Sequence, residues 1–368
     1  MTADKLSMDV LCAKFEQEFA KKQGRKDAIL FNSGGSANLA MIQALKNLGQ
    51  LKDGDHVGFS ALTWSTNTMP IIQMGLVPVA IDCELDTLNI SSKQLLKCLD
   101  QTNIKALFLT NVLGFVDDIW EVQNICNERG IILIEDNCES LGTETSYGKA
   151  GNFSLGSSFS FFVAHHMSTI EGGMICTDDE DFGEMLRIVR ANGWDRNLTA
   201  KQQNKWRKKF DIKGEFEAKY TFYDLGFNFR PTEITGFLGL FQLQYLDDNI
   251  QTRQKNYLEV ETEILANDDL LKLRHDHISL LSTFAIPVVC KTAQLREAYL
   301  SQFSGAGIEI RPMIAGNMQN QPFYKKYVKT LYDLPNSDFL HTNGFYCGNY
   351  PELTFNDIET IKSALQKI

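Results

Sequence analysis

The stretch "KALFLTNVLGFVDDIWEVQNICNERGIILIED", Lys105 to Asp136, decides the fold that the sequence predicts. It begins and ends with short, continuous apolar runs, "KALFLTN" and "IILIED", which are typical of parallel strands buried on both faces. Between them, "DDIWEVQNICNERG" has the spacing of a crossover helix. A strand, a helix and a second strand in this order predict a parallel pair within an α/β domain.

The same alternation continues on both sides of this unit. Further strands are expected at 56–60, 77–82, 159–163 and 174–176. A helix is expected at 9–20, and a Gly turn opens another that Gly49 ends. Two more helices are expected at 66–75, with Pro70 inside, and at 179–193. We therefore expect a mainly parallel sheet between helices.

The second half of the chain has a different pattern. The polar stretch from Asn197 to Lys219 predicts a long exposed loop, either a solvated insertion or a covering flap. Pro231 is expected as the first residue of a long helix that ends near Asn267. Strands at 284–289 and 308–314 and helices at 293–303 and 355–366 follow. We expect a large α/β domain at 1–235, and a linking helix with a small α+β domain at 236–368.

Composition excludes several classes of function. The net charge of −10 argues against a nucleic-acid surface, which needs a basic footprint. No apolar run reaches the roughly 20 residues that span a bilayer, and the N-terminus lacks the order of a signal peptide, so we expect a cytoplasmic protein without a membrane partner. None of the eight cysteines forms a Cys-x-x-Cys pair, so the sequence predicts no metal site and no iron–sulfur cluster.

Three features carry chemistry. Asp136 ends a strand, where a carboxylate can hold a protonated ring nitrogen, or alternatively cap a helix or form a salt bridge. Gly35 and Ser36 open a helix whose N–H groups can hold a phosphate, or form an ordinary turn. Trp64 can cover a flat ring or pack in the core. Together the three predict a site for a phosphorylated aromatic ring such as pyridoxal phosphate.

Five motifs make the sequence recognisable. They are "NSGGSANLA" (32–40), "EDNCESLG" (135–142), "SFSFFVAHHMSTIEGG" (158–173), "YDLGFNFRPTEITGFLGLFQL" (223–243) and "GNMQNQPFY" (316–324). With them the chain resembles, over nearly its whole length, the DegT/DnrJ/EryC1/StrS sugar aminotransferase family. The resemblance implies a fold type I pyridoxal phosphate-dependent transferase, an α/β fold with a mainly parallel, seven-stranded-type sheet and a smaller C-terminal α+β domain.

One position departs from the pattern of that family. Most members carry a lysine five residues after a strand serine, and this lysine bonds covalently to the cofactor. Ser160 matches the serine, but His165 stands at the lysine position, and the nearest lysines are Lys149 and Lys201. Pyridoxal phosphate, or its aminated form pyridoxamine phosphate, must then be held non-covalently. Imidazole is well suited to proton transfer near neutral pH.

This exchange is similar to a subgroup of 3-dehydratases that act on nucleotide-linked 4-keto-6-deoxy sugars. One branch of the subgroup binds an iron–sulfur cluster through clustered cysteines, which this chain lacks, so the resemblance favours the GDP-4-keto-6-deoxymannose branch. It implies that the C3 hydroxyl of a GDP-linked, or other nucleotide-linked, hexose or heptose is removed. It also implies that L-glutamate re-aminates the cofactor, and that a homodimer shares its active site across subunits.

The matching motif positions imply a role for each site residue. His165 would be the catalytic proton carrier, whereas His166 is expected to pack. The residues implied for cofactor binding are Gly35, Ser36 and Ser160 at the phosphate, Trp64 over the ring, Asp136 at the ring nitrogen, Glu139 near the phenolic oxygen, and Asn228 at the phosphate of a neighbouring subunit. Arg196, Arg230 and Arg311 are candidates for the sugar's diphosphate, or are surface or structural residues. Asn317, in "GNMQNQP", is a further substrate candidate.

Two other functions stay open at this point. A sugar aminotransferase that has lost its lysine would leave nitrogen on the sugar, and a catalytically silent regulator would bind pyridoxal phosphate without consuming any sugar. A metal site at His165 and His166 is less favoured, because adjacent histidines rarely chelate one ion.

Overall fold

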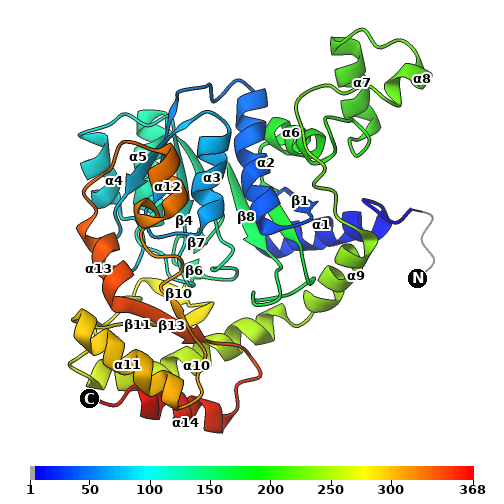
Figure 1. Ribbon diagram of the computed structural model, residues 1–368. Coiled ribbons are helices and arrows are strands. Elements are labelled where there is room, and N and C mark those ends of the chain that lie inside the picture. The colour runs from blue at the N-terminus through cyan, green and yellow to red at the C-terminus, as the bar shows by residue number, and fades with distance from the viewer. Residues whose placement is uncertain (1–4) are drawn as a thin grey trace.

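The computed structural model describes residues 5–368, and its centre is a seven-stranded sheet (Figure 1). The strand order is β1-β9-β8-β5-β4-β2-β3. The pairs among β2, β3, β4, β5 and β8 are parallel, and β9 runs antiparallel to both of its neighbours. The strands are β1 (Asp27–Phe31), β2 (His56–Ser60), β3 (Val77–Ile81), β4 (Ala106–Thr110), β5 (Ile132–Asp136), β8 (Gly156–Ser160) and β9 (Gly173–Thr177). The mainly parallel α/β fold is confirmed.

Helices cover both faces of this sheet. They are α1 (Val10–Gln23), α2 (Gly34–Asn47), α3 (Ser65–Gln73), α4 (Ser92–Leu99), α5 (Ile119–Arg129) and α6 (Glu180–Arg190). On β4, Ala106 and Phe108 pack with α2, α3 and α6, whereas Leu107 and Leu109 pack with α4 and α5. Consecutive side chains of a strand point to opposite faces, so a continuous apolar strand fills two cores.

The strand expected at 159–163 is shifted in the structure. β8 ends at Ser160, one bond from the Phe161 amide to the Gly172 carbonyl follows, and residues 162–171 form a turn outside the sheet. Phe162 and Val163 are exposed, because the apolar run continues past the edge of the sheet. The turn therefore lies at the carboxyl end of a parallel strand, where α/β proteins bind ligands.

The C-terminal part contains an antiparallel sheet of β11 (Ala285–Val289), β13 (Gly344–Gly348) and β12 (Ile310–Pro312). Its apolar residues share one core with residues of the large sheet's loops, among them Leu62, Leu113 and Phe115. A small sheet joins β10 (Ile278–Leu280) to β6 (Glu144–Thr145) and β7 (Gly148–Lys149). The remaining elements are α10 (Leu246–Ala266), α11 (Ala293–Gly305), the 3-10 helix η1 (Met318–Asn320), α12 (Pro322–Tyr327), α13 (Pro335–Asn343) and α14 (Phe355–Ala364). The domain boundary at 235/236 stays a prediction.

The long helix expected from Pro231 is wrong in two respects. The first helix, α9 (Glu233–Gln242), begins after Thr232, whose hydroxyl accepts a hydrogen bond from the Thr235 amide and so caps the helix. A turn then separates α9 from α10. The Glu233 carboxylate accepts hydrogen bonds from the Asp9, Leu11 and Cys12 amides, so α9 caps the start of α1.

The loop expected at 197–219 is also wrong, because this segment holds α7 (Ala200–Lys209) and α8 (Glu215–Ala218), which project from the body (Figure 1). Thr199 and Gln202 form a capping box at the start of α7. Trp206 is buried and donates its indole N–H to Glu184 of α6. One buried aromatic and a cap therefore order a helix whose sequence is otherwise polar.

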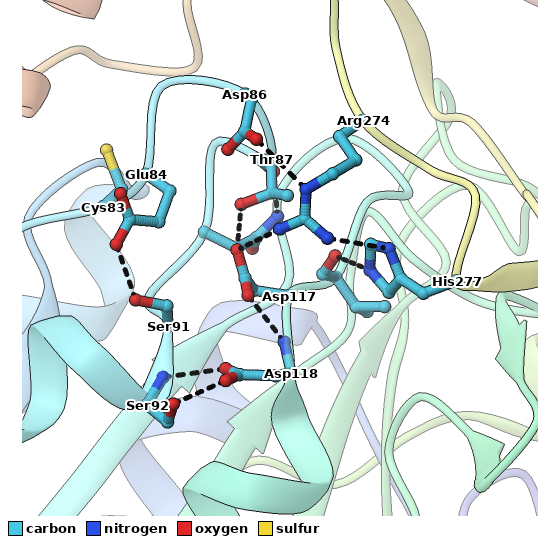
Figure 2. Close-up of polar contacts among 12 residues, drawn as sticks. Cys83, Glu84, Asp86, Thr87, Ser91, Ser92, Asp117, Asp118, Arg274 and His277 are labelled. Atoms are coloured by element: carbon cyan, nitrogen blue, oxygen red, sulfur yellow. Dashed lines mark hydrogen bonds and ion pairs between the residues drawn. The ribbon is translucent and has the colours of Figure 1, made fainter.

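A polar seam joins the segment after α10 to loops of the large sheet (Figure 2). Arg274 Nε donates to Asp86 Oδ2 over 3.0 Å, and its Nη2 lies 3.5 Å from Asp117 Oδ2. His277 Nε2 lies 2.9 Å from the Val116 carbonyl. Burial raises the pKa of Asp117, and the hydroxyl of Thr87 and the Arg274 guanidinium counteract this shift.

None of the helices in residues 5–368 is long and apolar enough to cross a membrane.

Candidate active site

Asp136, the last residue of β5, is held by three N–H donors. The side-chain amides of Asn38 and Asn67 each donate to Oδ2 over 2.8 Å, and the Cys138 amide donates to Oδ1 over 2.9 Å. The side chain is 3% exposed. These donors fix the orientation of a buried carboxylate at the ligand-binding edge of the sheet.

The sequence analysis missed Asn38 and Asn67. Asn38 lies in α2 and Asn67 in the first turn of α3, so both reach Asp136 only after the helices pack on the sheet. Thr63 donates to Asn67 Oδ1 over 3.0 Å, and its hydroxyl lies 2.6 Å from that of Thr110. The available signal was weak: both are asparagines at helical positions that a core would otherwise fill with apolar residues.

The start of α2 lies directly against the end of β8. Ser33 caps the helix by accepting from the Ser36 amide over 3.1 Å. A Cβ on Gly34 would lie 2.8 Å from Cβ of Ser160, so a residue other than glycine cannot fit without displacement. The structure thus brings Gly35, Ser36 and Ser160 to one place, beside a helix N-terminus that can hold a phosphate.

Trp64 immediately precedes α3, the helix that carries Asn67. It is 55% exposed, which argues against core packing and leaves an indole face available to a ligand.

Glu139 lies just beyond Asp136 and is half-buried. Its Oε2 accepts from the Leu113 amide over 3.0 Å. Burial raises the pKa of Glu139 to about 8, and the charge of Asp136 adds to the shift. Near neutral pH the Glu139 carboxyl therefore keeps a proton that it can donate.

His165 lies in the turn after β8, and its amide donates to the Phe162 carbonyl over 3.0 Å. Its ring packs edge-on against Phe284, with centroids 5.1 Å apart. The Phe284 amide donates to the Leu113 carbonyl, and the Leu113 amide donates to Glu139, so two residues connect His165 to Glu139. Burial lowers the pKa of His165 to about 4, and the charge of Arg253 contributes. The imidazole is therefore neutral at physiological pH, and its buried Nδ1 has no partner among the described residues.

His166 is buried, and its Nε2 lies 3.1 Å from the Ser282 carbonyl. Burial lowers its pKa well below the usual range, followed by the charge of Arg253. These contacts fit the packing role expected for it.

A cavity of about 830 Å³ separates the His165 turn from the C-terminal sheet. Arg253, Phe284, Arg311 and Tyr346 line it with His165. Burial raises the pKa of Tyr346 to about 12, and the charge of Glu139 contributes. No lysine of the described chain lines this cavity.

The two lysines nearest in sequence lie elsewhere. Lys149 Nζ donates to the Lys22 carbonyl over 2.8 Å and pairs with Glu144, whereas Lys201 is exposed on α7.

The other candidates occupy different places. Arg311, 60% exposed, lines the His165 cavity and pairs with Glu309. Arg230 Nε donates to Asn228 Oδ1 over 2.8 Å on an exposed segment. Within the part of the chain that the structure describes, no hydrogen bond joins these two residues to Asp136 or His165.

Two further candidates have local partners. The Arg196 guanidinium lies 3.8 Å from the ring centroid of Trp194, in the segment that precedes α7. Asn317 is buried, and its side chain caps η1 through the Gln319 amide and donates to Asp338 over 2.8 Å. The oxygen and the nitrogen of the Asn317 side-chain amide are thus both hydrogen-bonded within the fold.

This set of residues fits a phosphorylated aromatic ring. A buried carboxylate suits a ring nitrogen, a helix start with serine hydroxyls suits a phosphate, and an exposed indole suits a ring face. The residues come from β5, α2, α3 and β8, so the arrangement exists before any ligand binds.

Comparison with known proteins identifies the family of the chain. The family described as the DegT/DnrJ/EryC1/StrS aminotransferase family matches residues 1–366. The GDP-4-keto-6-deoxy-D-mannose 3-dehydratase of Escherichia coli O55:H7 is 34% identical over 359 residues, 96% of this chain and 91% of that protein.

Two solved structures are similar over 98% of this chain, with TM-scores of 0.90 and 33% identity. One is the E. coli GDP-4-keto-6-deoxy-D-mannose-3-dehydratase with bound hydrated PLP, 93% of which is covered. The other is a GDP-4-keto-6-deoxymannose-3-dehydratase with a trapped PLP-glutamate geminal diamine, of which 94% is covered.

Proposed function

The chain belongs to the DegT/DnrJ/EryC1/StrS aminotransferase family, and we propose that it is a pyridoxamine phosphate-dependent 3-dehydratase. The substrate is a GDP-linked 4-keto-6-deoxy sugar, which loses its C3 hydroxyl to give a 4-keto-3,6-dideoxy sugar, and L-glutamate regenerates the cofactor. The relatives' substrate, their PLP and their glutamate adduct support this assignment. The observation that carries it is His165 at the family's lysine position, in the wall of a large cavity whose described lining contains no lysine.

The cofactor would be held by residues already in place. Asp136 would pair with the ring nitrogen and Trp64 would cover the ring. The phosphate would lie between the start of α2, at Gly35 and Ser36, and the Ser160 hydroxyl. When bound, pyridoxamine phosphate supplies an amine that condenses with the sugar ketone and a ring that accepts electrons.

His165 and Glu139 would handle the protons. The His165 imidazole would accept a proton from the carbon that carries the cofactor's amine, because the ring is uncharged at neutral pH. The imidazolium then returns that proton to the oxygen that leaves C3. Glu139, protonated near neutral pH, donates a hydrogen bond to the cofactor's phenolic oxygen and leaves the ring electron-poor. Arg311, which lines the same cavity, would bind the sugar's diphosphate.

We also propose a homodimer. Ile234, Phe237, Phe241 and Tyr245 form one stripe along α9 and its end, and each is 46–57% exposed. Monomeric proteins rarely expose an apolar stripe of this size. A second copy would cover it, and Asn228, a few residues before α9, would reach the phosphate of the neighbouring subunit.

The eight free thiols suit a reducing compartment such as the cytoplasm.

The test is a panel of GDP-, CDP- and dTDP-linked 4-keto-6-deoxy sugars, each incubated with the purified protein, pyridoxal phosphate and glutamate. We expect a product lighter by one oxygen atom, with one ammonia and one 2-oxoglutarate released, and the GDP sugar turned over fastest. An aminated sugar without free ammonia would identify an aminotransferase instead. No consumption of any sugar would identify a silent binder.

A further inference from the structure

We infer that Arg253, in α10, is a positioning residue: its guanidinium clamps the His165 turn to the C-terminal sheet and sets the pH range in which His165 works. This inference rests on the proposed function of His165 as proton carrier. Arg253 would touch neither substrate nor cofactor and would act through the imidazole.

The guanidinium joins three separate segments. Nη1 donates to the Phe284 carbonyl over 2.9 Å and to the Asn349 carbonyl, and Nη2 donates to the His165 carbonyl over 3.5 Å. Phe284 is also the residue against which the His165 ring packs. One side chain therefore fixes the backbone of His165 and the aromatic neighbour that orients its ring.

The backbone of Arg253 is held in turn by the C-terminal sheet. Asn349 Nδ2 donates to the Arg253 carbonyl over 2.9 Å and to the Thr283 hydroxyl over 2.8 Å. Asn349 thus receives a bond from the guanidinium and returns one to the same residue. Such reciprocal contacts hold the clamp in one geometry.

The charge of Arg253 is unusual for its surroundings. The side chain is 3% exposed, and no carboxylate of the described chain lies within ion-pair distance of it. Burial lowers the pKa of Arg253 to about 10, with Glu352 opposing the shift, so the guanidinium stays protonated at neutral pH. A buried, uncompensated cation disfavours a second positive charge on a neighbouring imidazole.

Several other ionisable groups face His165. His166 adjoins it in the chain. The cavity wall adds Glu309 from the segment before β12, Arg311 from β12, Tyr346 from β13, Glu352 from the following loop and Asp357 from α14. Burial contributes most to the lowered pKa of His165, and Arg253 is the charge that adds to it. Arg311 is solvated and paired with Glu309, which reduces the effect of its charge on the pKa of His165.

The experiment compares Arg253→Met with Arg253→Lys. NMR of cofactor-free protein carrying ¹⁵N-labelled histidine measures the titration of the His165 ring, and initial rates measure kcat as a function of pH. In Arg253→Met we expect the His165 pKa to rise by about one unit and to stay below 6.5, the usual value. The acid limb of the kcat profile should move up equally, because His165 must be neutral to accept a proton.

Arg253→Lys keeps the charge but loses the fork that reaches three carbonyls. We expect the parent's His165 pKa and pH profile, with kcat lower by about tenfold because the turn is less well fixed. Arg274→Met is the matched control: this arginine also bonds across the molecule, in the seam of Figure 2, and its loss should lower the melting temperature without moving the His165 titration.

Two results would overturn the inference. One is an unchanged His165 titration in folded Arg253→Met. The other is a rise in the KM for glutamate with an unmoved pH profile, which would make Arg253 a substrate-binding residue. The NMR measurement needs no turnover, so it judges the inference even where the nucleotide-sugar panel disproves the dehydratase.

Discussion

The side-chain nitrogen of Asn38, in α2, lies 2.8 Å from Oδ2 of Asp136, at the end of β5. Because α2 also begins at the expected phosphate site, one helix fixes both ends of the proposed cofactor site. The covalent structure of the cofactor limits the distance between its phosphate and its ring nitrogen. A single rigid helix keeps the two groups that would bind them at a fixed separation.

We expect Asn38→Leu to weaken pyridoxal phosphate binding. A hydrogen bond to a charged group contributes about 1.5–3 kcal/mol, which corresponds to roughly a 10- to 100-fold increase in Kd. Asn67 would remain as the only amide at Oδ2. Fluorescence titration of cofactor-free protein measures the change.

Asn111→Leu is the control for this prediction. Asn111 Nδ2 donates to a different buried carboxylate, that of Glu135, over 3.0 Å. Its loss should lower the melting temperature while the Kd for the cofactor stays within twofold. Equal weakening by both variants would show that general destabilisation, and not Asp136, is responsible.

We expect His165→Lys to bond covalently to pyridoxal phosphate and to lose dehydration. A lysine at this position carries the amine that histidine lacks, so borohydride should fix the cofactor to the protein and mass spectrometry should find it on residue 165. His165→Gln should lose at least 10²-fold in kcat, as expected on removal of a general base, and retain exchangeable cofactor.

His166→Gln separates chemistry from packing in the same turn. His166 bonds to the Ser282 carbonyl, so we expect a lower melting temperature with kcat within threefold of the parent. If His166→Gln, and not His165→Gln, abolishes turnover, the roles of the two histidines must be exchanged.

The raised pKa of Glu139 should make the stability of the protein depend on pH. In the folded protein this pKa is about 8, above that of an unfolded glutamate. The contribution of Glu139 to stability is therefore fully present below the unfolded pKa and is lost as pH rises through 8. Glu139→Gln removes the effect. From pH 5 to pH 8.5, the melting temperature of cofactor-free Glu139→Gln should rise relative to the parent by about 3 °C. A constant difference would mean that Glu139 titrates normally.

Phe237→Glu combined with Phe241→Glu should give a monomer. The two rings lie one turn apart on α9 and are each 49% exposed, so charges there oppose association but not folding. Leu258→Glu with Leu265→Glu, exposed residues of α10, is the control and should leave the mass unchanged. Analytical ultracentrifugation measures the mass of the parent and of each variant in solution. A monomeric parent protein would refute the dimer.

The sequence allowed the sheet and the place of Asp136 at the end of a strand to be predicted because these signals are local. The apolar runs at 106–110 and 132–136 are buried on both faces, and such strands look the same wherever they pack. Asp136 ends a strand in both the sequence and the structure, and the position of His165 was inferred by comparison with a family motif.

The parts that escaped prediction depend on contacts between distant segments. Asn38 and Arg253 look like ordinary polar helix residues until packing brings each to a partner about 90 or more positions away. The order of α7 depends on the contact between Trp206 and Glu184, which are distant in the sequence. The capping box of Thr199 and Gln202 was visible in the sequence, but the polar composition of the segment favoured a loop.

The place of His165 has a consequence for divergence. Residues 162–164 are solvent-exposed and make none of the ladder bonds of β8 and β9, so side chains in this turn can be exchanged while the sheet keeps its packing. A change of residue 165 therefore breaks no bond of the ladder between β8 and β9. A protein with this scaffold can acquire a new chemistry through one codon while its central sheet stays intact.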